Sequence, residues 1–154
     1  MAQHTEAVVV FRRIAALEVL IGHMGGPFWT HRDEHAWSFP KGLPEPGDTD
    51  ALSTARREFA EELGFDAPAG DYVDLGEVQQ AGGKTVRAWA VEADPDLQDF
   101  VPGHFAMPWP PRSGRMQSYP ELDKVAWVGA VQARTLLVKA QSAFLDRLEE
   151  LLQD

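Results

Sequence analysis

The order of strand-like and helix-like segments predicts an α/β domain with a mixed sheet and helices on both faces. One group of strand-like segments precedes a helix, and a second group precedes two more helices. The apolar run at residues 7–11 is β-branched and continuous, as in a strand buried on both faces. No repeat or linker interrupts the 154 residues, so we expect one domain, residues 1–154.

The composition excludes several classes of protein and site. A net charge of −10 argues against a nucleic-acid polymer as partner, because phosphate backbones are bound mainly by basic residues. A small phosphorylated substrate is still compatible, since a divalent cation can supply local positive charge. The chain has no cysteine, which excludes disulfides, thiol nucleophiles and cysteine-based zinc sites.

The first strands are expected at residues 7–11 and 17–21. Residues 24–36 are expected to form a loop, which a short strand at 37–39 follows until Pro40 ends it. The longest apolar run near the start is too short for a signal peptide or a membrane span. We therefore expect a cytoplasmic protein that does not interact with a membrane.

A helix is expected after the turn-rich link at residues 43–50. Asp48 or Asp50 is suited to be its N-cap, and Gly64 to end it. Its core face is predicted from residues within one narrow arc: Leu52, Ala55, Phe59 and Leu63.

Three glutamates of this helix, Glu58, Glu61 and Glu62, lie at i, i+3 and i+4 and so share one side. Relative to the core face, Glu58 and Glu62 should be partly shielded and Glu61 more exposed to water. Three like charges at this spacing repel one another, which invites a cation. A solvated acidic helix face is the alternative.

The second half of the chain contains one long segment without clear periodicity, residues 100–120, which we expect to be an irregular loop. The remaining predicted elements are two strands at 72–80 and 84–92 joined by a turn at Gly82-Gly83, a final strand at 122–128, and helices at 131–138 and 142–152.

The residues around the glutamates favour a metal site over a solvated face. Carboxylates are hard oxygen ligands that suit Mg²⁺ or Mn²⁺. The carbonyl of Gly42, in the turn facing the helix, is a further candidate ligand. Arg57 could brace a neighbouring carboxylate through paired hydrogen bonds, and a glutamate that is not a ligand could act as general base.

The central stretch resembles the signature of the Nudix hydrolase family. The second half of that signature is complete, in Arg57, Glu58, Phe59, Glu61, Glu62, Gly64 and Phe65. Gly42, after the segment 37–41, matches the opening glycine. The segment from Gly42 to Arg57 is one residue longer than in the signature, and the expected glutamate is replaced by Asp48 or, counted from the other end, by Thr49. Asp48 is the better substitute.

The resemblance implies an α/β/α sandwich around a mixed sheet and a Mg²⁺- or Mn²⁺-dependent pyrophosphohydrolase. Water would attack a phosphorus of a nucleoside diphosphate linked to another group. Carried onto this chain, the metal ligands are the Gly42 carbonyl, Glu58, Glu61 and Glu62; the catalytic residues are Glu58, Glu61 and Arg57; auxiliary acidic residues are Asp48 and Glu121.

Candidate substrate-binding residues lie outside the helix. Lys41 and the two loop arginines, Arg112 and Arg115, could hold phosphates, although each could equally be a surface charge. A base could stack on Tyr119, Trp29 or Trp109, aromatic residues that more often pack as core or loop anchors. The histidines lack zinc-ligand spacing.

The wider resemblance, in the segments 25–29, 37–42 and 109–115, is to a bacterial subgroup of small MutT-like proteins described as NTP pyrophosphohydrolases. The Pro-Lys-Gly turn is also similar to that of diadenosine tetraphosphate hydrolases. A dinucleoside polyphosphate or a nucleoside triphosphate is therefore the expected substrate. The alternatives are ADP-ribose or a nucleotide sugar, and a non-catalytic nucleotide-binding domain. The sequence leaves open whether the protein forms a homodimer.

Overall fold

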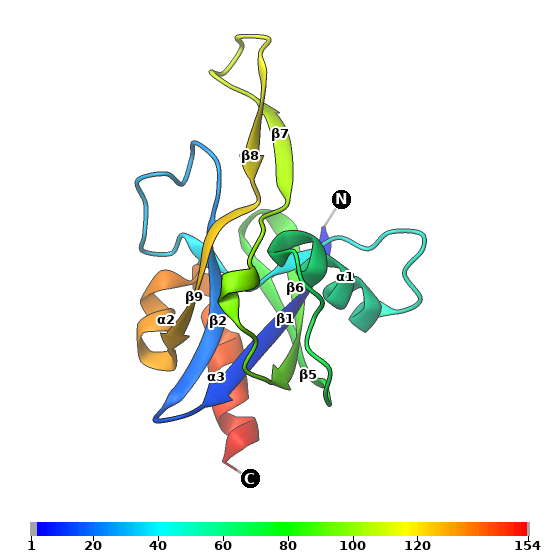
Figure 1. Ribbon diagram of the computed structural model, residues 1–154, viewed down its shortest axis with the longest axis vertical. Coiled ribbons are helices and arrows are strands. Elements are labelled where there is room, and N and C mark those ends of the chain that lie inside the picture. Colours follow the sequence, from blue (N-terminus) through cyan, green and yellow to red (C-terminus); the bar gives the residue numbers. More distant parts are fainter. Residues whose placement is uncertain (1–2, 154) are drawn as a thin grey trace.

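A mixed sheet lies at the centre of the protein in the computed structural model, which describes residues 3–153 (Figure 1). Its path runs β3-β2-β1-β6-β5, with β4 paired to β1 and β9 paired to β2. β1 and β6 are parallel, and the other pairs are antiparallel. The strands are β1 (His4–Arg13), β2 (Leu17–Met24), β3 (Trp37–Ser38), β4 (Lys41–Gly42), β5 (Val73–Gln80), β6 (Lys84–Glu92) and β9 (Leu122–Gly129).

Helices cover both faces of this sheet, as the sequence predicts. They are α1 (Ala51–Leu63) on one face and α2 (Ala130–Leu136) and α3 (Ser142–Leu152) on the other (Figure 1). Short 3-10 turns are η1 (Ala81–Gly83), η2 (Leu97–Asp99) and η3 (Lys139–Gln141). No helix within residues 3–153 is long and apolar enough to span a membrane.

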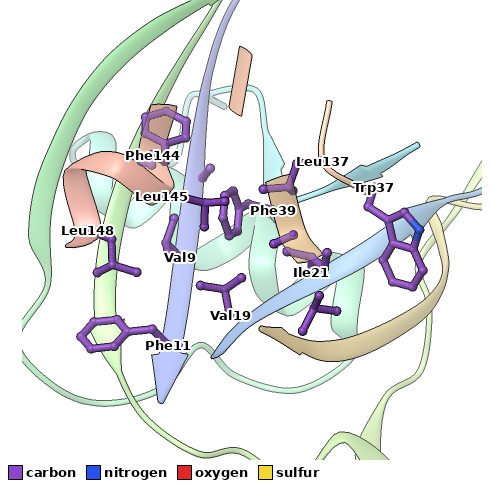
Figure 2. Packing of buried hydrophobic residues seen from close by; sticks show 14 of the residues in the cluster. Val9, Phe11, Val19, Ile21, Trp37, Phe39, Leu137, Phe144, Leu145 and Leu148 are labelled. Atoms are coloured by element: carbon purple, nitrogen blue, oxygen red, sulfur yellow. The ribbon is translucent and has the colours of Figure 1, made fainter. Parts of the chain in front are cut away.

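Alternation along β1 explains why its apolar run is continuous. Val9 and Phe11 face α3, where they pack with Phe144, Leu145 and Leu148 (Figure 2). The intervening Val8 and Val10 face α1 and pack in a second cluster with Phe59 and Leu63. A strand buried on both faces needs apolar residues at every position. The second cluster holds α1 against β1, the strand that pairs with β4.

The ends of α1 follow the sequence prediction closely. Asp50 is the N-cap: its side chain accepts a hydrogen bond from the Ser53 N–H, and the Ser53 hydroxyl accepts one from the Asp50 N–H. Gly64 ends the helix in the left-handed conformation at φ 81°, and its N–H bonds the Ala60 carbonyl. The caps fix where α1 begins and ends, while its packed face of Ala55, Phe59 and Leu63 decides which side its glutamates face.

The prediction of an irregular loop at residues 100–120 is wrong. This segment contains a hairpin of β7 (His104–Pro108) and β8 (Met116–Pro120), which projects from the body of the protein (Figure 1). Phe105 and Met107 are half-buried between exposed neighbours, a strand alternation that the prolines obscured. Pro108 and Pro120 are tolerated because they end two strands that have no further strand beside them.

Candidate active site

The three glutamates of α1 differ sharply in exposure. The side chain of Glu58 is 16 % exposed and that of Glu61 54 % exposed. Glu62 is 8 % exposed. This order confirms the prediction from the helix geometry. The three carboxylates therefore have different environments although they share one side of the helix.

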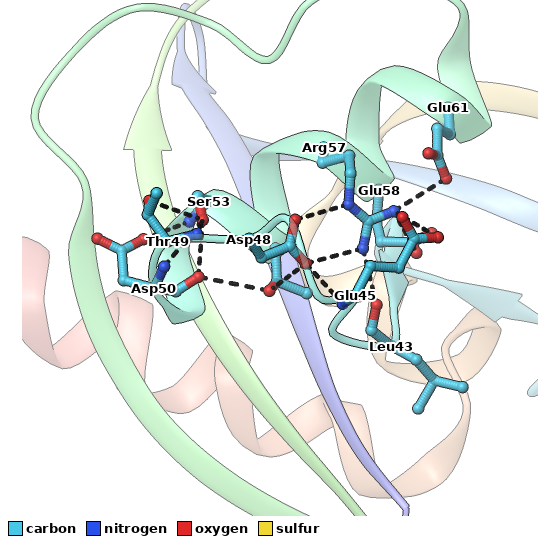
Figure 3. A network of polar contacts seen from close by, with 10 residues as sticks. Leu43, Glu45, Asp48, Thr49, Asp50, Ser53, Arg57, Glu58 and Glu61 are labelled. Atoms are coloured by element: carbon cyan, nitrogen blue, oxygen red, sulfur yellow. Dashed lines mark hydrogen bonds and ion pairs between the residues drawn. The ribbon is translucent and has the colours of Figure 1, made fainter.

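Arg57 uses all five of its N–H groups within this region (Figure 3). Nε and one Nη2 hydrogen bind the two oxygens of Asp48, at 2.9 and 3.0 Å. The other Nη2 hydrogen binds the Leu43 carbonyl, and Nη1 donates to Glu58 and Glu61. Arg57 therefore holds the link and the helix together and has no donor left for a substrate.

Asp48, and not Thr49, takes the acidic place beside Arg57. Besides the bidentate pair with Arg57, Asp48 accepts hydrogen bonds from the Glu45 N–H and the Thr54 hydroxyl. These donors hold the pKa of Asp48 well below its usual range. The Thr49 hydroxyl instead contacts Ser53. Both oxygens of Asp48 are engaged by donors, so this residue holds the longer loop in place.

Glu58 divides its two carboxylate oxygens between two neighbours. Oε1 accepts a hydrogen bond from Arg57 Nη1 at 2.9 Å. The carboxyl group also lies so close to Gly42 that any Cβ at that position would overlap its Cδ and Oε2. Glycine at this place therefore lets the helix carboxylate approach the backbone of β4. Burial, the largest influence, raises the pKa of Glu58, and Arg57 opposes it.

Glu62 has only a weak counterbalance for its negative charge. Its Oε1 accepts a hydrogen bond from the Lys41 N–H at 3.0 Å. Burial nevertheless raises its pKa to about 8, with the Lys41 N–H and charge acting in the opposite direction. Burial thus outweighs the stabilisation that Lys41 gives to the ionised form of Glu62.

Glu62 lines a cavity of about 200 Å³ together with Lys41 and Glu121, which we call the Lys41 cavity. Burial raises the pKa of Glu121 and lowers that of Lys41, while the lysine and the carboxylates each favour the other's charged form. The other lining residues are Met24, Gly25, Trp29, Ser38, Phe105 and Leu122. Charged groups of both signs therefore converge in one small space.

Two parts of the carboxylate cluster could hold a divalent cation. Oxygens of Glu45, Glu58 and Glu61 lie within 4.8 Å of one another. Arg57 Nη1 already lies against all three, at 3.5, 2.9 and 3.1 Å. The guanidinium explains their closeness without a metal. The Gly42 side differs, because Glu58 and Glu62 have raised pKa values there and the oxygen donors suit Mg²⁺ or Mn²⁺.

The candidate substrate residues are spread over a wide region. Lys41 lines the cavity beside Glu62. Arg112 and Arg115 lie exposed in the turn of the projecting hairpin, away from α1 (Figure 1). Tyr119 is half-buried at the base of the hairpin, and its ring lies 6.1 Å from that of Phe105. The structure thus brings together Lys41 and Glu121 with the glutamates, but not the two arginines.

Sequence reasoning missed one member of the site and named another only among several candidates. Glu45 contacts Arg57 from a loop whose path cannot be read from its prolines and glycine. Trp29 was considered only as one of three stacking candidates, yet its side chain lines the Lys41 cavity. The aromatic Trp109, by contrast, packs edge-on against Phe28 at 5.4 Å in the hairpin turn. Its place far along the hairpin keeps it out of the cavity lining.

Comparisons with known proteins agree with this architecture. The family model described as "NUDIX domain" matches residues 3–148. No curated protein matches the sequence.

Several solved structures have the same fold. One is a complex of the Caenorhabditis elegans Ap4A hydrolase, with a TM-score of 0.68 and 19 % identity over 97 % of this chain and 98 % of that one. Another is the NUDIX domain of Shewanella oneidensis NrtR with ADP ribose, with a TM-score of 0.66 and 16 % identity over 99 % of this chain and 89 % of that one. A third is the Mycobacterium smegmatis Nudix hydrolase RenU, with a TM-score of 0.58 and 21 % identity over 99 % of this chain and 88 % of that one.

Proposed function

The chain belongs to the Nudix family. We propose that it is a pyrophosphohydrolase that hydrolyses a small nucleotide with a divalent metal bound between β4 and α1. The observation that carries this proposal is the convergence of Glu58, Glu62 and Lys41 beside Gly42. The Glu58 carboxyl group fills the space that the glycine leaves beside β4, Glu62 accepts a hydrogen bond from the Lys41 N–H, and burial raises the pKa of both carboxylates. A cation there would stabilise both ionised forms.

The proposed ligands are Glu58, Glu62 and the Gly42 carbonyl, with Glu61 completing the set. Glu61 is accessible enough to turn one oxygen toward the cation while the other contacts Arg57. When bound, Mg²⁺ or Mn²⁺ would screen the diphosphate, polarise phosphorus and help to activate water. Arg57 would act as a positioning residue, because its N–H groups hold Glu58 and Glu61 in place.

The residues of the Lys41 cavity would handle charge and protons in the reaction. Lys41 would bind a non-bridging oxygen of the diphosphate. A glutamate, Glu58, Glu61 or the auxiliary Glu121, would take the proton of the attacking water. The water oxygen bonds to phosphorus, the anhydride P–O bond breaks, and the leaving phosphate carries away the electron pair. Raised pKa values make Glu58 and Glu121 stronger bases than free carboxylates.

The substrate is proposed to be a dinucleoside polyphosphate or a nucleoside triphosphate. ADP-ribose or a nucleotide sugar is the second candidate, which the ADP-ribose complex of the NrtR domain supports by likeness of fold. A non-catalytic binding role is disfavoured by the complete arginine and glutamate set of α1. A cytoplasmic location and a possible homodimer remain part of the proposal, as does the absence of polymer and membrane partners.

A nucleotide panel with Mg²⁺ or Mn²⁺ tests the proposal. Diadenosine tetraphosphate should give ATP and AMP, a nucleoside triphosphate should give a monophosphate and pyrophosphate, and ADP-ribose should give AMP and ribose phosphate. Glu62→Gln should lose at least about a hundredfold in rate, since metal effects amount to several kcal/mol and each 1.36 kcal/mol is tenfold. Absence of metal-dependent products, or full activity of Glu62→Gln, would refute the proposal.

A further inference from the structure

A second cavity adjoins the Lys41 cavity and shares Trp29 with it. Its volume is about 740 Å³, within the usual range for small-molecule sites, whereas the Lys41 cavity of about 200 Å³ suits a group of phosphate size. The loop between β2 and β3, the turn between β5 and β6, and η3 each form part of its wall. It is lined by Trp29, Arg32, Asp33, Glu34, His35, Gln80, Ala81, Val138, Lys139 and Ala140.

A buried amide joins the walls of the two cavities. Gln141 is fully buried, and its Oε1 accepts a hydrogen bond from the Phe39 N–H at 3.0 Å. Its Nε2 donates to the Ser38 hydroxyl at 3.0 Å and to Gln80 Oε1 at 3.1 Å. Ser38 lines the Lys41 cavity and Gln80 lines the larger one. The backbone donor of Phe39 fixes the orientation of this chain of amides.

The same hydrogen-bond chain leaves the amide Nε2 of Gln80, with its two N–H donors, available for a ligand. Because Gln80 Oε1 accepts from Gln141, its Nε2 must point elsewhere. Within residues 3–153 no hydrogen bond from Gln80 Nε2 is found, and Gln80 lies in the wall of the larger cavity. An acceptor atom on a ligand, such as a ring nitrogen or carbonyl, would satisfy it.

Trp29 lines both cavities and offers a flat apolar ring. It is half-buried and packs against the core on the face of the sheet that α2 and α3 cover. The guanidinium of Arg32 lies 5.3 Å from its ring centre, which helps to hold the ring in place. A planar heteroaromatic ring is the ligand group that stacks best on an indole.

We propose that the larger cavity binds the nucleobase of the substrate, which stacks on Trp29 and accepts a hydrogen bond from Gln80 Nε2. The diphosphate of the same molecule then lies in the Lys41 cavity on the other side of Trp29. This assignment rests on the proposed function and extends it: recognition is directed at a base on one side of the diphosphate. Trp29 and Gln80 are thus the specificity residues, although they lie outside the signature helix.

Binding of uncharged nucleosides to the metal-free protein tests this site separately from catalysis. Adenosine, guanosine, cytidine and uridine are each added, with ribose as the base-free reference, and the shifts of the Trp29 indole and Gln80 amide signals are followed by NMR. At least one nucleoside should bind at least about tenfold more tightly than ribose and move both signals. Equal binding of all nucleosides and ribose would overturn the inference.

Two variants locate the binding, and a third serves as control. Gln80→Glu keeps the acceptor for Gln141 but removes the donor, and Trp29→Leu removes the stacking surface; each should reduce the preference for the nucleoside at least about threefold. Gln79→Glu makes the same chemical change at an exposed neighbour and should leave it unaffected. If Trp29→Leu does not fold, Gln80→Glu decides the test. Unchanged preference in Gln80→Glu contradicts the assignment.

The proposed hydrolysis can fail independently of this site. A protein that binds the nucleoside through Trp29 and Gln80 but releases no product from any nucleotide with Mg²⁺ or Mn²⁺ would refute the reaction and retain the base site. Hydrolysis with identical KM values for wild type and Gln80→Glu, together with ribose-like nucleoside binding, would do the reverse.

Discussion

Arg57 and Glu62 lie on the same helix, but their surroundings are opposite. Arg57 has a partner for every N–H, and the carboxyl groups of Asp48, Glu45, Glu58 and Glu61 lie around it. We call this group, with the Leu43 carbonyl, the Arg57 network. Glu62 is buried in the Lys41 cavity with a pKa raised to about 8. Every donor of Arg57 is paired on one side, whereas on the other a single lysine, Lys41, faces two buried carboxylates, Glu62 and Glu121.

This difference distinguishes the residues that position the site from the residues that would take part in its chemistry. A network whose central arginine has every donor paired resists change and can hold the link and α1 in register. Carboxylates that lose hydration on burial, without enough hydrogen bonds or positive charge to replace it, are stabilised when a cation binds. The acidic cluster therefore has two parts with different roles. Substitutions in the two parts should differ in their effects on activity, stability and pH dependence.

The largest expected effect comes from closing the gap beside β4. In Gly42→Ala the new methyl group would overlap the carboxyl group of Glu58 and push it from its place. We expect kcat/KM with Mg²⁺ to fall about a hundredfold, as for other changes that displace metal ligands. Gly47→Ala is the matched control in the same loop, because no atom lies within 4 Å of its added methyl. Similar activities of the two variants would disprove the close-approach argument.

The next effect is on stability and comes from the Arg57 network. Arg57→Lys cannot make the bidentate pair, so Asp48, whose side chain is 9 % exposed, would lose its main partner. We expect a loss of about 2 kcal/mol in the free energy of unfolding, measured in urea. Arg56→Lys, at an exposed neighbour, should change it by less than about 0.5 kcal/mol. Equal stability of Arg57→Lys and wild type would show that the network contributes nothing.

The Lys41 cavity should instead reveal itself in the pH dependence of the metal-free protein. The pKa of Glu62, about 8 when folded, exceeds the unfolded value of roughly 4.3. The folded state therefore keeps a proton that the unfolded state releases, and stability falls as pH rises from about 4 toward 8. Glu62→Gln should remove this decline, which is at most about 1.4 kcal/mol per pH unit.

Thermal unfolding in a chelator at pH 5 and pH 8 measures this effect. Glu62→Gln should gain stability relative to wild type at pH 8 and little at pH 5. The exposed Glu61→Gln serves as control and should not show this pattern. A Glu62→Gln variant with the same pH dependence as wild type would mean that Glu62 is ionised at no cost in the folded state.

The smallest effect is expected in the projecting hairpin. Arg112 and Arg115 are exposed and lie outside both cavities. Replacing both with alanine should raise KM by no more than about threefold, because exposed ionic contacts are weak, and leave kcat unchanged. A much larger rise in KM would mean that the hairpin turn reaches the phosphates of a long substrate.

The central strands of the sheet and the helix α1 could be predicted from the sequence because their signals are local. Apolar periodicity placed residues 7–11, and capping residues placed both ends of α1. The hairpin was missed because its prolines dominate the local pattern, although Phe105 and Met107 alternate correctly.

The helix geometry also predicted the order of exposure of the three glutamates. It could not predict that Trp29, Gln80 and Lys139 line one cavity, because these residues are distant in sequence and meet only when the sheet forms. The role of Asp48 likewise depends on how the longer loop folds back onto Arg57. Long-range contacts of this kind leave no periodic signal.

The comparison is tested most directly by Mn²⁺ binding, followed by electron paramagnetic resonance, in wild type, Glu62→Gln and Glu45→Gln. The two variants make the same chemical change on opposite sides of the cluster. We expect Glu62→Gln to weaken Mn²⁺ binding at least about tenfold and Glu45→Gln to change it less than about twofold. Weakened binding in Glu45→Gln with wild-type affinity in Glu62→Gln would place the metal in the Arg57 network and contradict the account.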